Sequence, residues 1–208
     1  GKVNGRVWSF RDVTVRKQVE QERDNSLAWE RAARADAETV KRRLTLLDDV
    51  SRTLAGSLDY EVTLKTIVQL AVPELADWCG VYLVGHDQQI SLAAVAHQDP
   101  RMMEISKEYQ RLYAPQWSDS YGVADVIRNG ESRLVSVLTG EELKRVASNP
   151  SHLKMLQSLQ LKSSIVAPMT ARGRILGAVT FVYSETSRYY ASDDVALVEE
   201  FGRRAAYA

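Results

Sequence analysis

The longest regular pattern in the chain is an apolar stripe between residues 33 and 58. Its members recur at alternating steps of four and three residues, with Ser51 as the one interruption. They are Ala33, Ala37, Val40, Leu44, Leu47, Leu54 and Leu58. A period of 3.5 residues is typical of a helix that pairs with another helix along one seam. We therefore predict one helix from about residue 13 to residue 58, paired with a second copy of the chain.

After residue 58 the pattern alternates between helical and strand-like segments. A Gly-Ser-Leu-Asp sequence at 56–59 predicts the end of the long helix, and a broad apolar stripe predicts a second helix over 60–75. Apolar runs bounded by turns predict strands over 78–84, 89–97, 163–170 and 175–183. Further helices are expected over 100–113 and 150–160 and from residue 192 onward.

These elements indicate an α+β fold, an α/β sandwich in which helices cover both faces of an antiparallel sheet of five to six strands. Residues 114–149 are the least regular part, with a helical turn at 123–127 and a short strand at 133–137. We expect this part to lie over one face of the sheet like a lid. In the last helix, Val198, Phe201 and Ala205 are predicted to continue the helix-pairing seam.

Composition narrows the functional classes. The 208 residues contain 27 Lys and Arg and 27 Asp and Glu, so net charge gives no reason to expect a nucleic-acid or membrane-surface partner. No apolar run approaches the roughly 20 residues that a membrane span needs. The single cysteine excludes an internal disulfide and a multi-cysteine zinc site. These features favour a cytoplasmic protein without membrane contact.

The N-terminal residues resemble the end of a PAS domain. A strand-like segment at 1–10 is followed by Asp12, Val13 and Thr14 and then by a segment rich in Arg, Lys, Gln and Glu. Short oxygen-bearing side chains at such a junction can cap the exposed N–H groups of a helix. The resemblance implies that residues 1–14 are the C-terminal remnant of a PAS domain and that residues 15–43 form a coiled-coil linker helix.

Residues 44–208 resemble a GAF domain of the kind found in bacterial multidomain signalling proteins. The resemblance is carried by short segments in a characteristic order: residues 76–83, 121–124, 126–131, 161–164, 167–169 and 173–181. It implies a sensory, dimerising module of a signal-transduction protein. The expected parent is a sensor histidine kinase of a two-component system, and a metal-dependent serine phosphatase is the alternative.

Residue types that could support catalysis or cofactor attachment are sparse. Cys79 lies within a predicted buried strand and is not followed by histidine, as the chromophore-binding cysteine of bilin-binding GAF domains commonly is. His86, His97 and His152 match no helical metal-ligand spacing, although His97 at a strand end could ligate haem or a metal. We expect no metal site and no enzymatic activity in this chain. The sequence does not indicate a particular cofactor, and a bilin- or haem-binding sensor domain is an alternative interpretation.

GAF domains generally bind small molecules between the sheet and the irregular middle region. The residues expected to line such a site are mainly aromatic and apolar, and ordinary core packing is the competing interpretation for each. They are Tyr82, His97, Tyr113, Trp117, Tyr121, Met155, Leu159 and Val166.

Overall fold

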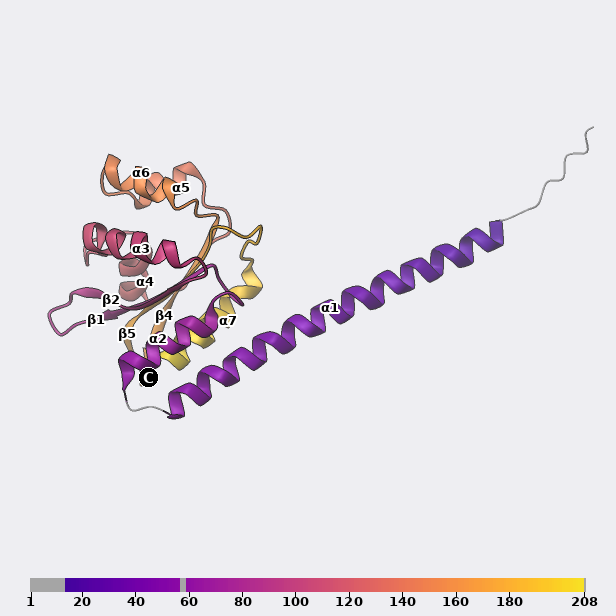
Figure 1. Cartoon of the computed structure of the whole chain (residues 1–208), viewed down its shortest axis with the longest axis horizontal. Coiled ribbons are helices and arrows are strands. Elements are labelled where there is room, and N and C mark those ends of the chain that lie inside the picture. The colour runs from indigo at the N-terminus through magenta and orange to yellow at the C-terminus, as the bar shows by residue number, and fades with distance from the viewer. Residues whose placement is uncertain (1–13, 57–58, 208) are drawn as a thin grey trace, which may run out of the picture. The chain divides into compact units, whose positions relative to one another are not determined.

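The computed structural model describes residues 14–56 and 59–207, which fall into two units that divide between Leu44 and Thr45. The predicted strand at 1–10, the Asp12–Val13 junction and Leu58 lie outside the described residues. Figure 1 shows the elements of each unit.

The first unit consists of most of one long helix. Helix α1 (Thr14–Gly56) has 43 residues, close to the predicted 13–58. On its predicted seam Ala33 and Ala37 are exposed, as are Val40 and Leu44, whose exposed fractions are 55% and 63%. These four side chains are therefore free to contact another helix, and their pairing stays a prediction.

The second unit is built on an antiparallel sheet. Its strands are β1 (Trp78–Val84), β2 (Ile90–His97), β3 (Arg133–Val135), β4 (Ser163–Ala171) and β5 (Arg174–Tyr183). They are arranged in the order β2-β1-β5-β4-β3. The two predicted hairpins, β1–β2 and β4–β5, are both present. Gly173 adopts a positive φ of 72° in the second turn, which explains the glycine there.

Helices cover both faces of this sheet, as predicted (Figure 1). On one face lie α2 (Tyr60–Ala71), α7 (Ser192–Ala205) and the last turns of α1. The other face carries α3 (Pro100–Tyr113), α4 (Gly122–Asn129), α5 (Gly140–Val146) and α6 (Pro150–Ser158). The sequence analysis did not predict α5, whose seven residues are too few for a periodic signal.

The main core lies beneath α7, and its composition shows that part of the predicted helix-pairing seam was assigned wrongly. Val198, Phe201 and Ala205 were assigned to pairing between chains, but they are at most 1% exposed within this one domain. Phe201 packs edge to face on Phe181 of β5, with 5.1 Å between ring centroids. An antiparallel sheet needs a cover for its apolar face, and the stripe of α7 supplies that cover here.

The C-terminal turns of α1 also belong to this core. Leu47 is 8% exposed and the partly buried Leu54 packs against the buried cluster, so both contribute to the core of their own domain. The guanidinium of Arg204 on α7 donates to the carbonyl of Leu47 at 2.5 Å and to the hydroxyl of Ser51. The stripe therefore changes its role near Thr45, from exposed positions to positions in the domain core.

A buried carboxylate ties the start of β1 to the segment after β5. Oδ2 of Asp77 accepts the backbone N–H groups of Ser184, Glu185 and Thr186 at 2.9–3.0 Å and the Thr186 hydroxyl at 3.1 Å. Burial raises the pKa of Asp77, but these hydrogen bonds outweigh it and hold the pKa below its ordinary value. Asp77 is therefore an ionised anchor of the fold.

Strands β1 and β5 approach each other closely at Gly177. A Cβ atom there would overlap the backbone carbonyl of Tyr82, so the position requires glycine on steric grounds.

Candidate functional site: a cavity over the sheet

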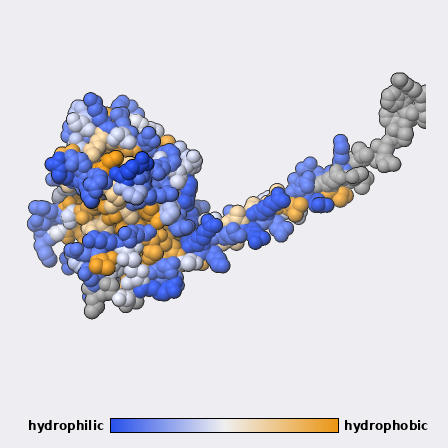
Figure 2. All heavy atoms as spheres, viewed as in Figure 1, coloured by the Kyte–Doolittle hydropathy of each residue, from blue (hydrophilic) through white to orange (hydrophobic). Residues whose placement is uncertain are grey.

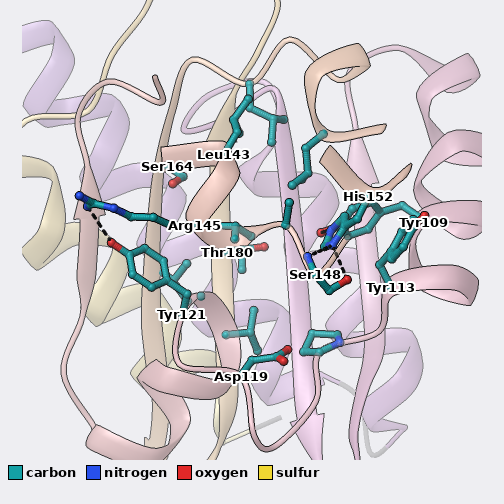
Figure 3. A pocket seen from close by; sticks show the side chains of 18 of the residues that line it. Tyr109, Tyr113, Asp119, Tyr121, Leu143, Arg145, Ser148, His152, Ser164 and Thr180 are labelled. Atoms are coloured by element: carbon teal, nitrogen blue, oxygen red, sulfur yellow. Dashed lines mark hydrogen bonds between the residues drawn. The ribbon is translucent and has the colours of Figure 1, made fainter. Parts of the chain in front are cut away.

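A cavity of about 400 Å³ lies between the sheet and the helical middle region. Figure 3 shows its walls. Its floor is formed by alternate residues of three strands, which are Trp78 and Tyr82 of β1, Ser164 and Val166 of β4, and Thr180 and Val182 of β5. Residues from α3, α5, α6 and the loop 115–121 close it from above. This volume falls within the range of small-molecule sites in proteins, about 300–1,000 Å³.

His152 on α6 is held as a neutral ring at one wall. Its Nδ1 accepts the backbone N–H of Ser148 at 3.0 Å, so the ring proton lies on Nε2, which is 3.0 Å from the Tyr109 hydroxyl. The ring of Tyr113 stacks on His152 with 4.1 Å between centroids. Burial lowers the pKa of His152, and the nearby Asp119 carboxylate opposes this shift. The wall thus presents aromatic surface and hydroxyl groups without a positive charge.

A second tyrosine reaches the cavity from the sheet. The Tyr82 hydroxyl accepts a hydrogen bond from Nε2 of Gln110 at 2.5 Å, which links β1 to α3. Burial raises the pKa of Tyr82 to about 12. This hydroxyl stays protonated near neutral pH and can itself donate to an acceptor.

Tyr121 lies at the cavity edge within a charged cluster. The guanidinium of Arg133 lies 3.5 Å from the centroid of its ring. Its hydroxyl contacts Glu142 at 3.4 Å and Arg145 at 3.5 Å, and Arg145 also pairs with Glu142 at 3.0 Å. These contacts fix the ring orientation, and the carboxylate of Glu142 balances the charge of Arg145.

The loop that carries Asp119 is fixed from α4. Nη1 of Arg128 donates to the carbonyls of Trp117 and Asp119 at 2.6 and 2.7 Å. Oδ2 of Asp119 accepts the backbone N–H of Gln116 at 2.8 Å. The carboxylate is thereby placed at one end of the cavity, as Figure 3 shows.

Five of the eight residues expected at a ligand site line the cavity. They are Tyr82, Tyr113, Tyr121, Leu159 and Val166. The other three, His97, Trp117 and Met155, are not among the lining residues. Whether the cavity holds a ligand stays a prediction.

Local packing explains why His97 and Trp117 lie elsewhere. Nδ1 of His97 accepts the backbone N–H of Asp99 at 2.8 Å, and its ring packs on the edge of Trp78. Trp117 is 37% exposed and contributes only its carbonyl to the loop contact with Arg128.

Some of the polar residues that the sequence analysis missed lie on regular elements, namely Tyr109 on α3, Ser164 on β4 and Thr180 on β5, and others come from the irregular middle region. Asp119, Arg145 and Ser148 line the cavity, and His152 was considered only as a metal ligand. The one signal that could have found His152 is its spacing from Asn149, which caps α6 by accepting the His152 backbone N–H.

The single cysteine lies away from the cavity. Cys79 is fully buried in the core on the opposite face of the sheet, and burial raises the pKa of its thiol. Within residues 14–56 and 59–207, no group of three or more His, Cys, Asp or Glu side chains is placed to hold a metal ion. In the same residues, no helix is both long and apolar enough to cross a membrane.

Solved structures similar to this chain share its fold. The GAF domain of a phosphoenolpyruvate-protein phosphotransferase from Coxiella burnetii is 16% identical, with a TM-score of 0.58 over 80% of this chain and 91% of that chain. Free methionine-R-sulfoxide reductase from Neisseria meningitidis, in complex with its substrate, is 16% identical, with a TM-score of 0.57 over 79% of this chain and 86% of that chain.

A third similar structure carries a chromophore. The phycocyanobilin-bound GAF domain of a cyanobacterial phytochrome is 14% identical, with a TM-score of 0.54 over 79% of this chain and 91% of that chain. A search of curated protein sequences found no match. The model of the GAF domain family matches residues 59–208. This match covers most of the chain, and the chain therefore belongs to the GAF domain family.

Proposed function

We propose that this chain is a non-catalytic regulatory module that binds a small molecule in the cavity and transmits its binding to the terminal helices. The observation that carries the proposal is a cavity of about 400 Å³ lined by aromatic side chains and a few oriented polar groups. A cavity of this composition is the usual form of a small-molecule site.

The floor of the cavity offers a route from a ligand to the helices. On β5, Thr180 and Val182 face the cavity, whereas Val179 and Phe181 belong to the core beneath α7. A ligand that displaces the cavity face of this strand also shifts the packing of Phe201 on the other face. Such a ligand changes the populations of two helix arrangements only by the difference in its affinity for them.

The proposal includes a homodimer through the N-terminal helix. Ala33, Ala37, Val40 and Leu44 form an exposed stripe with the heptad spacing of a helix seam. Pairing there lets a change in one domain reach the helix of the other chain. Because Val198, Phe201 and Ala205 are buried in their own domain, they are no longer part of this proposed interface.

The parent protein is proposed to be a bacterial sensor histidine kinase, and a metal-dependent serine phosphatase is the alternative effector. The resemblance of residues 1–14 to a PAS domain end supports a multidomain signalling protein. The sequence of the parent gene downstream of this segment distinguishes the two effectors directly.

Native mass spectrometry of the freshly purified chain tests ligand binding and dimerisation together. We expect twice the mass of the chain plus a retained small molecule. A cavity-filling variant, Ser164→Phe, should release that molecule. Thr170→Phe on the same strand is the matched control, because Thr170 does not line the cavity. Retention of the molecule by Ser164→Phe would contradict binding in the cavity.

A bilin or haem is a second candidate ligand, favoured by the similarity to the phycocyanobilin-bound GAF domain. Cys79 lies in the core on the opposite face, so it cannot anchor a chromophore in the cavity. Expression in bilin- and haem-producing cells tests this candidate, because a bound cofactor gives absorbance above the protein band. A colourless product eliminates it.

A further inference from the structure

The charge distribution of the cavity narrows the chemistry of its ligand. Among the described residues that line it, only Asp119 and Arg145 carry formal charges near neutral pH. Arg145 is balanced by Glu142 at 3.0 Å, and Figure 3 shows its guanidinium reaching along the cavity edge to the Tyr121 hydroxyl. Asp119 has no cationic partner within the part of the chain that the structure describes. The uncompensated charge of the cavity is therefore negative, and it lies on an exposed side chain at one end of the cavity.

Arg128 lies beside Asp119 and donates to its backbone carbonyl at 2.7 Å, but its guanidinium is itself paired with the Asp125 carboxylate at 3.3 Å. Burial raises the pKa of the Tyr109 hydroxyl and lowers the pKa of the His152 ring, and in both cases the charge of the Asp119 carboxylate acts to raise the pKa. His152 stays neutral because its Nδ1 already accepts the Ser148 N–H. The wall facing Asp119 thus offers no cation and supplies hydroxyl groups and aromatic faces instead.

From this arrangement we infer that the ligand is a small organic cation, a primary amine or amidine on an aromatic or other apolar body, whose cationic group pairs with Asp119. Aromatic side chains at Tyr109, Tyr113 and Tyr121 suit such a ligand, because aromatic rings both bury apolar surface and attract cations. The hydroxyls of Ser148 and Thr180 can accept further N–H groups. This inference rests on the proposed function, since it concerns the same cavity.

A matched set of three probes tests the sign of the preferred charge. These are 2-phenylethylammonium, 2-phenylethanol and 3-phenylpropionate, which share a phenyl body and differ in charge. Titration into the ¹⁵N-labelled full chain, followed by backbone amide shifts, gives an affinity for each. An ion pair with an exposed carboxylate predicts that the ammonium probe binds about fivefold more tightly than the alcohol, and the propionate binds most weakly.

Variants locate the effect at Asp119. Asp119→Asn keeps an acceptor for the Gln116 N–H. It should weaken binding of the ammonium probe about fivefold while leaving binding of the alcohol within about twofold. Glu141→Gln removes one carboxylate from α5 outside the cavity and should change neither affinity.

Tighter binding of the propionate, equal binding of the ammonium probe by Asp119→Asn, or no binding of any probe would each overturn the inference. None of these results would contradict the finding of a bound molecule by native mass spectrometry or its release by Ser164→Phe. The proposed function can therefore stand when this assignment of ligand charge fails.

Discussion

Replacing Asp77 should cost the domain a large part of its stability. Asp77 is fully buried, and one of its oxygens accepts three consecutive backbone N–H groups and a hydroxyl group. Asp77→Ala removes this acceptor and leaves the donors behind. Glu185 is exposed, so its N–H can bond to water, whereas Ser184 is buried and Thr186 is half-buried.

The expected magnitude follows from these donors. A buried donor left without a partner costs about 1–3 kcal/mol. Two such donors and the loss of a charge-assisted acceptor give about 4 kcal/mol for Asp77→Ala, a large fraction of the 5–15 kcal/mol typical of a domain. Asp77→Asn keeps a neutral acceptor of the same shape and should cost about half as much, roughly 2 kcal/mol.

Urea unfolding followed by tryptophan fluorescence measures these losses, because Trp78 is a buried neighbour of Asp77. The pKa of Asp77 is lowered in the folded state, so its contribution is fully present above the ordinary value of 3.8 and is lost as the pH falls through the lower folded pKa. The stability of Asp77→Asn should therefore decline less steeply below pH 4 than that of the wild type.

A matched control separates this role from general loss of charge. Asp87→Asn removes a carboxylate in the exposed β1–β2 turn that accepts the Gln89 N–H at 3.1 Å. It should cost less than about 1 kcal/mol. If Asp77→Asn matched Asp87→Asn in both stability and acid response, the account of Asp77 as an ionised anchor would be refuted.

Three further predictions concern packing and titration. Gly177→Ala should cost more than about 3 kcal/mol in urea unfolding, because its Cβ meets the backbone of the neighbouring strand. Gly140→Ala should change stability by less than about 1 kcal/mol, since open space surrounds that position. Equal effects of the two substitutions would contradict the steric argument. Val40→Asp should convert the proposed dimer to a monomer in sedimentation equilibrium without changing the stability of the domain, whereas Leu47→Asp should unfold the domain. A dimer that Val40→Asp leaves intact would refute the proposed seam. His152 has a lowered pKa in the folded state, so its contribution to stability is present above its ordinary pKa of 6.5 and is lost as the pH falls below that value. Between pH 7.5 and 5.5 the wild type should therefore lose more stability than His152→Gln. Parallel curves of unfolding free energy against pH for the two proteins would refute this prediction.

The strands and most helices of this domain could be predicted from the sequence because their patterns are local. The runs at 78–84 and 175–183 match β1 and β5 closely. The role of each apolar stripe could not be predicted in the same way. Val198 and Phe201 have the same spacing whether they face another chain or their own sheet, and only the fold shows that the sheet needs them as its cover.

The cavity was only partly predictable for a related reason. Tyr82 and Val166 could be placed because they lie on strands, where side chains alternate between faces. Asp119 and Ser148 lie in loops whose positions depend on distant contacts, such as the hydrogen bonds from Arg128 to the loop 117–119. The periodicity of apolar residues in a sequence does not predict contacts of this kind.

The alternation along β5 limits how this domain can diversify. Substitutions at Thr180 and Val182 can change what the cavity recognises while the interior contacts of Phe181 remain intact, because neighbouring positions point to opposite sides. A one-residue insertion or deletion within the strand would exchange the two sets and disrupt both at once. We therefore expect natural or engineered variants to acquire new specificity by exchange of side chains at constant strand length.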